Sequence, residues 1–166
     1  MPEKPLPVDE ILAMLRAGPP RLAAAAAGLD AAQLSARPGQ DEWSANETLA
    51  HLRSCADMWG AAIETIIAED APTIRAVNPT TWIKSTDYLE LEFAASLRAF
   101  ATQRGALLAV LEALPAESWA RSATVTGAGR PLTRSIHAYA QWLATHERPH
   151  LKQIERAARA LRSRSA

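Results

Sequence analysis

Several features that would assign this sequence to a particular class of protein are missing from its 166 residues. It contains a single cysteine, Cys55, so an intramolecular disulfide cannot form. Residues 1–5 have neither the basic nor the apolar region of a secretory signal peptide, and we therefore expect a cytoplasmic protein. No apolar run approaches the roughly 20 residues that a membrane-spanning helix needs, so we expect no membrane partner.

Excess charge of either sign is also missing. The 18 lysine and arginine residues balance the 18 aspartate and glutamate residues, which gives a formal net charge of zero. Because proteins that bind nucleic acids usually carry a basic surface, this balance gives no electrostatic reason to expect a nucleic-acid partner.

Strand-forming patterns are scarce as well. β-Branched residues are few, and no segment alternates convincingly between apolar and polar residues, so we expect no β-strand. Alanine and leucine dominate instead, and both favour helices. Apolar residues make up 48% of the chain, which is enough for one sizeable core. The sequence therefore predicts a single all-α domain over residues 1–166.

Apolar residues recur every three or four positions in four long stretches, as they do on the buried face of a helix. The second stretch has the clearest start, because Ser44 and Glu47 belong to the capping box Ser-Ala-Asn-Glu. Four long helices with short or moderate connections predict a four-helix bundle. We place these helices from about Val8 to Gly28, from Ser44 to Ala71, from Asp87 to Leu114, and from Pro131 through Leu161.

Proline and glycine mark the expected interruptions. Gly18-Pro19-Pro20 lies inside the first helix and predicts a break or kink there, since proline removes a backbone donor. Residues 72–86 and 124–130 contain prolines or glycines and predict ordered loops. Pro131 suits the first turn of the last helix, and Leu89 is expected on the inward face of the third.

The last helix contains the pentapeptide His-Glu-Arg-Pro-His at residues 146–150. Residues four apart lie on one helix face, one turn from each other, so both imidazoles can bind one metal ion. His150 also continues the apolar stripe through Ile136 and Leu143, which directs the pair toward the bundle core. Two partly buried histidines bonded to carbonyl or carboxylate groups have the same spacing, so the pair alone leaves both interpretations open.

A third histidine, His51, lies two turns into the second helix. If it points inward, it completes a set of three nitrogen ligands with His146 and His150. Three histidines with an open position are typical of a catalytic zinc-type site, and imidazole also suits nickel, iron and copper. Cys55, one turn beyond His51, is either a further ligand or a small buried hydrophobe. His137 is rotated away from the ligand stripe, so we expect it at the surface or toward a loop.

Two other residues of the pentapeptide have two interpretations each. Pro149 removes a helix donor, which either only kinks the helix or re-aims the two histidines toward one point. Glu147 is either a general base beside the metal, as in His-Glu-x-x-His proteases, or a solvated or salt-bridged side chain.

Two motifs, taken together, resemble the DinB/YfiT-like superfamily of bacterial four-helix bundles. Residues 43–52, Trp-Ser-Ala-Asn-Glu-Thr-Leu-Ala-His-Leu, resemble that family's entry into the second helix. Residues 146–154, His-Glu-Arg-Pro-His-Leu-Lys-Gln-Ile, resemble its His-x-x-x-His-Leu-x-Gln-Ile signature in the last helix. The turn over residues 127–132 also fits, and spacing and order agree over nearly the whole chain. Pro149 is the departure from the pattern.

The resemblance implies a divalent metal ion held by His51, His146 and His150, with water in the remaining positions, and it implies a homodimer. Zinc, nickel, iron and manganese are all candidates for the ion. Some relatives are thiol S-transferases or isomerases that use bacillithiol, mycothiol or glutathione, and many have no known activity. In the transferase chemistry, the metal stabilises the thiolate that acts as nucleophile.

Three functions are compatible with such a site. The first, and our leading hypothesis, is a metal-dependent thiol S-transferase acting on a small-molecule substrate, with an electrophile pocket lined by Trp59, Trp82 and Trp142, although each tryptophan also suits core packing. The second is a metal-dependent hydrolase, in which water is the nucleophile and Glu147 the catalytic base. The third is a non-catalytic, metal-stabilised dimer that binds a ligand or partner.

Overall fold

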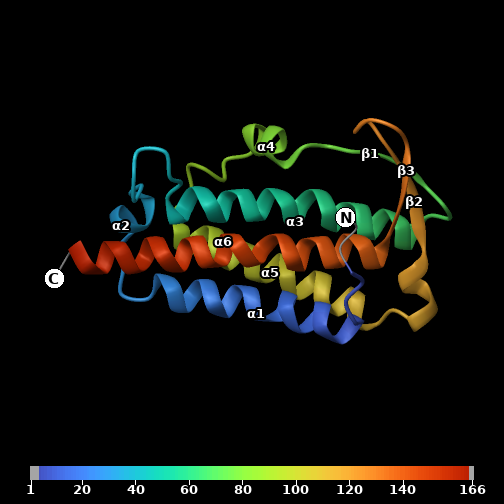
Figure 1. Ribbon diagram of the computed structural model, residues 1–166, viewed down its shortest axis with the longest axis horizontal. Coiled ribbons are helices and arrows are strands. Elements are labelled where there is room, and N and C mark those ends of the chain that lie inside the picture. The colour runs from blue at the N-terminus through green and yellow to red at the C-terminus, as the bar shows by residue number, and fades with distance from the viewer. Residues whose placement is uncertain (1–3, 165–166) are drawn as a thin grey trace.

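In the computed structural model, which describes residues 4–164, four long helices lie side by side (Figure 1). α1 (Val8–Ala26) and α3 (Ala45–Ala68) each pack against both α5 (Phe93–Glu112) and α6 (Ile136–Arg164). One diagonal of the bundle is therefore formed by α1 and α3, and the other by α5 and α6. This confirms the four-helix bundle predicted from the sequence. None of the described helices is both long and apolar enough to cross a membrane.

The predicted capping box sets the start of α3. The hydroxyl of Ser44 accepts a hydrogen bond of 3.0 Å from the backbone N–H of Glu47. The Glu47 carboxylate in turn accepts one of 2.8 Å from the backbone N–H of Ser44. Arg37 also binds this carboxylate from the preceding loop, with Nε 3.0 Å from one oxygen. The start of the helix that carries His51 is thus fixed by local hydrogen bonds.

The first helix is continuous from Val8 to Ala26, with Pro19 and Pro20 inside it, so of the predicted break or kink the break is wrong and the kink stays a prediction. Pro19 has no N–H to donate to the carbonyl of Leu15, one turn earlier. That carbonyl instead accepts a hydrogen bond of 3.0 Å from the Arg104 guanidinium on α5. A side chain from another helix therefore replaces the missing backbone donor.

A small three-stranded sheet closes one end of the bundle, and it corrects the expectation that the chain has no strands (Figure 1). The strands β1 (Thr73–Arg75), β2 (Ser122–Thr126) and β3 (Leu132–Ser135) lie in this order. β1 pairs with β2 in parallel, and β2 pairs with β3 in antiparallel orientation. On β2, Ala123 and Val125 turn inward and are buried in the core.

Several boundaries differ from those predicted. Pro131 precedes β3, and α6 starts only at Ile136, so the expected role of this proline in the first turn of the helix is wrong. α5 starts at Phe93, and Leu89 before it is 51% exposed rather than inward. The remaining short elements lie in the connections: α2 (Ala31–Ser35), α4 (Pro79–Trp82), and the 3-10 turns η1 (Ile83–Ser85) and η2 (Ala116–Ala120).

The buried apolar residues form two clusters, one toward the sheet and one toward the other end. The first includes Leu15 of α1, and the second includes Leu22 on the same helix. Between them along the helices lie buried polar side chains, above all Arg104 of α5 and Glu147 of α6. The histidines of interest lie in the same middle region of the bundle.

Candidate metal centre

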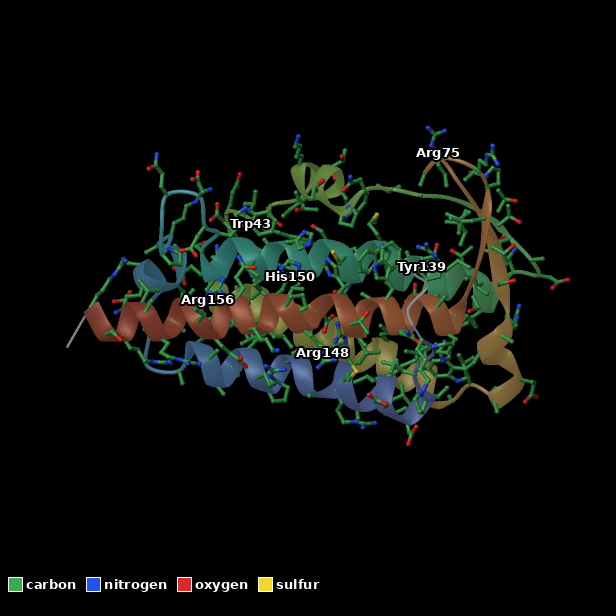
Figure 2. All side chains as sticks on the ribbon, in the orientation of Figure 1. Trp43, Arg75, Tyr139, Arg148, His150 and Arg156 are labelled. Carbon is green, nitrogen blue, oxygen red and sulfur yellow. The ribbon has the colours of Figure 1, made fainter. Side chains whose placement is uncertain are left out.

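Two helices bring the three predicted histidines together. His51 comes from α3, and His146 and His150 come from successive turns of α6, which runs directly beside α3 (Figure 2). The ring centroids of His146 and His150 are 4.7 Å apart. The ring of His51 lies 5.3 Å from that of His146 and 4.9 Å from that of His150. All three imidazoles are half-buried and face one another.

The hydrogen bonds of the cluster leave ligand atoms available. Nδ1 of His146 is buried and has no hydrogen-bond partner. Nδ1 of His150 lies 3.3 Å from the side-chain oxygen of Gln153. Because an amide oxygen only accepts, this contact makes Nδ1 the donor and leaves Nε2 of His150 free to bind a metal. A buried orphan nitrogen among three converging imidazoles fits a transition-metal ion.

The electrostatics of the cluster keep the imidazoles neutral. Burial, reinforced by the neighbouring imidazoles of His150 and His51, lowers the pKa of His146 to about 4. Burial also lowers the pKa of His51, with a smaller contribution from His150. The pKa of His150 is lowered by burial, although Gln153 partly opposes the shift. Neutral imidazole is the form that binds a metal, so the three side chains are ready to act as ligands.

The structure also brings Cys55 to this cluster. Its Sγ lies 3.6 Å from Nε2 of His51, one helical turn away. Ligand atoms of His51, Cys55 and His146 all lie within 4.8 Å of one another. Cys55 is buried, and burial raises the pKa of its thiol to about 12. Both interpretations of this residue, a further ligand and a small buried side chain, are thus compatible with its position.

The carboxylate of Glu147 is held in a buried ion pair. Its two carboxylate oxygens bind the two terminal nitrogens of Arg104, one of them at 3.0 Å. Both side chains are almost completely buried, at 2% to 3% exposure. A Cβ on Gly18 would lie 3.3 Å from the same carboxylate, so α1 also approaches it closely. The salt-bridged alternative therefore describes its surroundings, and the role of a catalytic base stays a prediction.

His137 lies outside the cluster, as the sequence predicted. Its Nε2 lies 2.8 Å from the backbone oxygen of Leu6, and its ring packs 6.3 Å from that of Trp119. Pro149 is exposed on α6, which continues as one helix to Arg164. The two histidines that flank this proline still meet His51.

Two of the three predicted tryptophans line a cavity beside the histidines. Trp59 packs edge-on against His146 at 5.0 Å and stacks on Trp142 at 4.2 Å. Both tryptophans contribute to a cavity of about 620 Å³ between α3, the sheet and the start of α6. Trp82 does not line this cavity, because its indole nitrogen donates to Asp57 on another face of α3. The predicted pocket is thus formed without Trp82.

Sequence reasoning missed Arg104 and Arg134. Arg104 occupies a position of the buried stripe of α5, four residues after Phe100 and three before Leu107. An arginine at such a position is a signal for a buried ion pair, since a charge is rarely buried without a partner. Arg134 carried no comparable signal, because it lies in a strand that the sequence did not predict.

The comparisons with known proteins agree with this geometry. The family model of the DinB superfamily matches residues 14–154. The fold is similar to a solved structure described as "YfiT from Bacillus subtilis is a probable metal-dependent hydrolase with an unusual four-helix bundle topology". The TM-score is 0.80 at 17% sequence identity, over 96% of this chain and 91% of that one. At this identity the likeness establishes the fold alone.

Among curated proteins, none matches this sequence significantly. The family match nevertheless extends over most of the chain and includes all three histidines of the cluster. The chain therefore belongs to the DinB superfamily.

Proposed function

We propose that this protein is a metal-dependent hydrolase whose divalent ion is held by His51, His146 and His150. The observation that carries the proposal is the convergence of the three imidazoles, with ring centroids 4.7 to 5.3 Å apart. The unpartnered Nδ1 of His146 supports it, because a buried polar atom normally has a partner. The description of YfiT as a probable metal-dependent hydrolase favours hydrolysis over the other reactions.

A divalent ion held by these three histidines would supply a Lewis acid and would lower the pKa of a bound water molecule, to about 7 if the ion is zinc. The neighbouring cavity favours an enzyme over a purely structural centre, since it provides room for a substrate on the other side of Trp59, whose ring contacts His146. Trp59 and Trp142 give this cavity aromatic walls that bind an apolar group and limit the access of bulk water. The proposal assigns no catalytic role to Glu147, whose carboxylate is held by Arg104.

The metal content of purified variants tests the ligand set. We expect about one metal ion per chain in the wild type and little in His150→Gln, because removal of one ligand weakens binding strongly. His137→Gln is the matched control, since His137 lies outside the cluster. Elemental analysis of protein purified without chelators provides the measurement. Equal metal content in the His150→Gln and His137→Gln variants would refute the proposed ligands.

The role of Cys55 is decided in the same experiment. A Cys55→Ala variant keeps its metal if the three histidines suffice, as we propose. If the thiol replaces His150 as the third ligand, Cys55→Ala loses the metal and His150→Gln retains it.

Hydrolysis is tested with chromogenic aryl esters and amides. We expect turnover that is lost on removal of the metal, restored by adding it back, and absent in His146→Gln. Glu147→Gln reports on the alternative base. If Glu147 were the base, this variant would stay folded and metal-loaded but inactive, whereas its pairing with Arg104 predicts reduced stability instead.

A thiol S-transferase is the second candidate, and the apolar cavity beside the histidines is the observation that favours it, because the same space suits an electrophile. The test is metal-loaded protein incubated with bacillithiol, mycothiol or glutathione and a generic electrophile. Turnover that depends on a thiol would replace hydrolysis as the function. Homodimer formation, implied by the family resemblance, stays a prediction that light scattering in solution can check.

A further inference from the structure

The charged residues that line the cavity beside Trp59 and Trp142 are all positive. Two arginines line it, Arg75 from β1 and Arg134 from β3, and no acidic residue does. Most of the remaining lining is apolar, from α3, the sheet and the start of α6. A cavity of about 620 Å³ with apolar walls and cationic groups is suited to a small molecule with an apolar body and a negative charge.

Arg134 is the better placed of the two cations. Its guanidinium carbon lies 4.3 Å from the ring centroid of Trp142 and 5.4 Å from that of Tyr139. These aromatic faces hold the guanidinium in place but leave its N–H donors without an anion. Among residues 4–164, no carboxylate forms an ion pair with Arg134, although the side chain is half-buried.

The wall that holds Arg134 leads directly to the histidines. Trp142 stacks on Trp59 at 4.2 Å with 20° between the rings. Trp59 then meets His146 edge-on at 5.0 Å. Trp59 therefore connects the wall beside Arg134 to His146, while none of the three histidines is among the residues that line the cavity.

We propose that this cavity binds apolar small molecules that carry a carboxylate, which pairs with Arg134 and is supported by the exposed Arg75 at the end of the sheet (Figure 2). The planar fork of a guanidinium matches the two oxygens of a carboxylate. This inference rests on the proposed function, because it names the substrate class of that hydrolase. The substrate is an ester or amide whose apolar body bears a free carboxylate.

Binding of non-hydrolysable probes tests the inference without relying on catalysis. Calorimetry with the purified protein compares 3-phenylpropanoate with 4-phenyl-2-butanone, which has nearly the same shape but carries no charge and no bond that can be hydrolysed. We expect the carboxylate to bind about ten-fold more tightly, as a charge-assisted hydrogen bond to a half-buried arginine predicts. The third probe is 2-phenylethylphosphonate, whose P–C bond is not hydrolysed, and tighter binding of it than of 3-phenylpropanoate would overturn the choice of carboxylate.

Variants locate the binding group. We expect Arg134→Gln to lose the preference for the carboxylate, and Arg75→Gln to reduce it by only about three-fold because this side chain is exposed. Arg159→Gln is the matched control with the same charge change on an exposed site of α6, and it keeps the full preference. Far-UV circular dichroism and thermal unfolding check that Arg134→Gln is folded, and Arg134→Lys keeps a partial preference through its charge.

The metal itself can bind a carboxylate, so the His150→Gln variant and chelator-treated wild type complete the design. Our inference predicts that the preference persists in both, since Arg134 holds the carboxylate. Loss of the preference on metal removal, an unchanged preference in Arg134→Gln, or no binding of any probe would each overturn it. A preference without esterase or amidase activity would overturn the proposed hydrolase alone.

Discussion

At His146, burial and two neighbouring imidazoles act in the same direction, and both disfavour the protonated ring. The same effect acts more weakly on His51 and His150. Acid therefore destabilises the metal-free protein. As the pH falls below the ordinary pKa of histidine, these rings bind protons in the unfolded chain before they do so in the folded protein.

This response predicts how the stability of the metal-free protein depends on pH. Between about pH 6.5 and about pH 4, the unfolded chain binds more protons at His146 than the folded protein does, so the free energy of unfolding falls as the pH is lowered. Each unit of the pKa shift corresponds to about 1.4 kcal/mol. Urea unfolding of chelator-treated protein at several pH values provides the measurement.

The control for this prediction is a pair of matched variants. His146→Asn should flatten the dependence in this window, because the shifted group is gone, while His137→Asn should keep the slope of the wild type. An identical slope in His146→Asn and wild type would contradict the assignment of the effect to His146.

The site could be predicted residue by residue only where the pattern is local. His146 and His150 share a face of one helix, and His51 follows a recognisable helix start, so spacing and the family motif sufficed to predict that all three lie close together. The position of Cys55 beside His51 was also foreseeable from the turn between them. The partner of Glu147 was not, because Arg104 lies 43 residues away on another helix and only packing brings them together.

At the scale of single elements, the buried network of Leu15, Arg104 and Glu147 explains how α1 tolerates its prolines. Arg104 gives one hydrogen bond to the carbonyl that Pro19 leaves without a donor and binds both oxygens of Glu147. Gly18 next to it has no side chain, which lets α1 approach the ion pair. Three helices are thus joined in the middle of the bundle, between its two apolar clusters.

We predict that removal of Arg104 is severely destabilising. Arg104→Met leaves the Glu147 carboxylate buried without a partner and the Leu15 carbonyl without a donor, which should cost about 3–5 kcal/mol. Arg104→Met combined with Glu147→Leu should recover much of this loss, because no uncompensated charge then remains.

A third change separates the two contributions. Pro19→Ala restores a backbone N–H at residue 19 that can donate to the carbonyl of Leu15. In the double variant, this change should add about 1–3 kcal/mol to the free energy of unfolding. In the wild type it should add less, because Arg104 already satisfies that carbonyl. Chemical denaturation of the four variants gives these values, and an equal effect of Pro19→Ala in both backgrounds would contradict the shared role of Arg104.

Among the elements, the long helices were predictable and the strands were not. Apolar periodicity and a capping box identify a helix from its own residues, as for α3. β1 and β2 have three and five residues, and they pair although about 50 residues separate Thr73 from Thr124. Strands of this length are stabilised by their partners, so their own sequence carries little signal.

At the scale of the whole molecule, the proposed metal ion would connect α3 to α6 and so bind only the folded chain. At a free metal concentration of about 1,000 times the dissociation constant, this linkage contributes about 4 kcal/mol to folding. For a domain of this size, the unfolding temperature should then fall on the order of 10 °C when the metal is removed.

Thermal unfolding of the protein before and after chelation measures this shift. The His150→Gln variant is the control and should unfold at the same temperature with and without metal. A wild type that contains the metal but shows no shift would indicate that the ion binds equally well to the unfolded chain.

The packing partners of α1 determine how much of the chain must be translated before this helix can be buried. α1 packs against α5 and α6, and a ribosome releases these partners only after most of the sequence has been translated. Until then, the apolar side chains of Ile11, Leu15 and Leu22 on the first helix have no partners to cover them. His51 likewise lacks the other two histidines of the proposed site, which are translated almost 100 residues later. The core can therefore be completed, and the proposed metal bound, only when synthesis is nearly finished, and until then the nascent chain exposes apolar surface that favours aggregation.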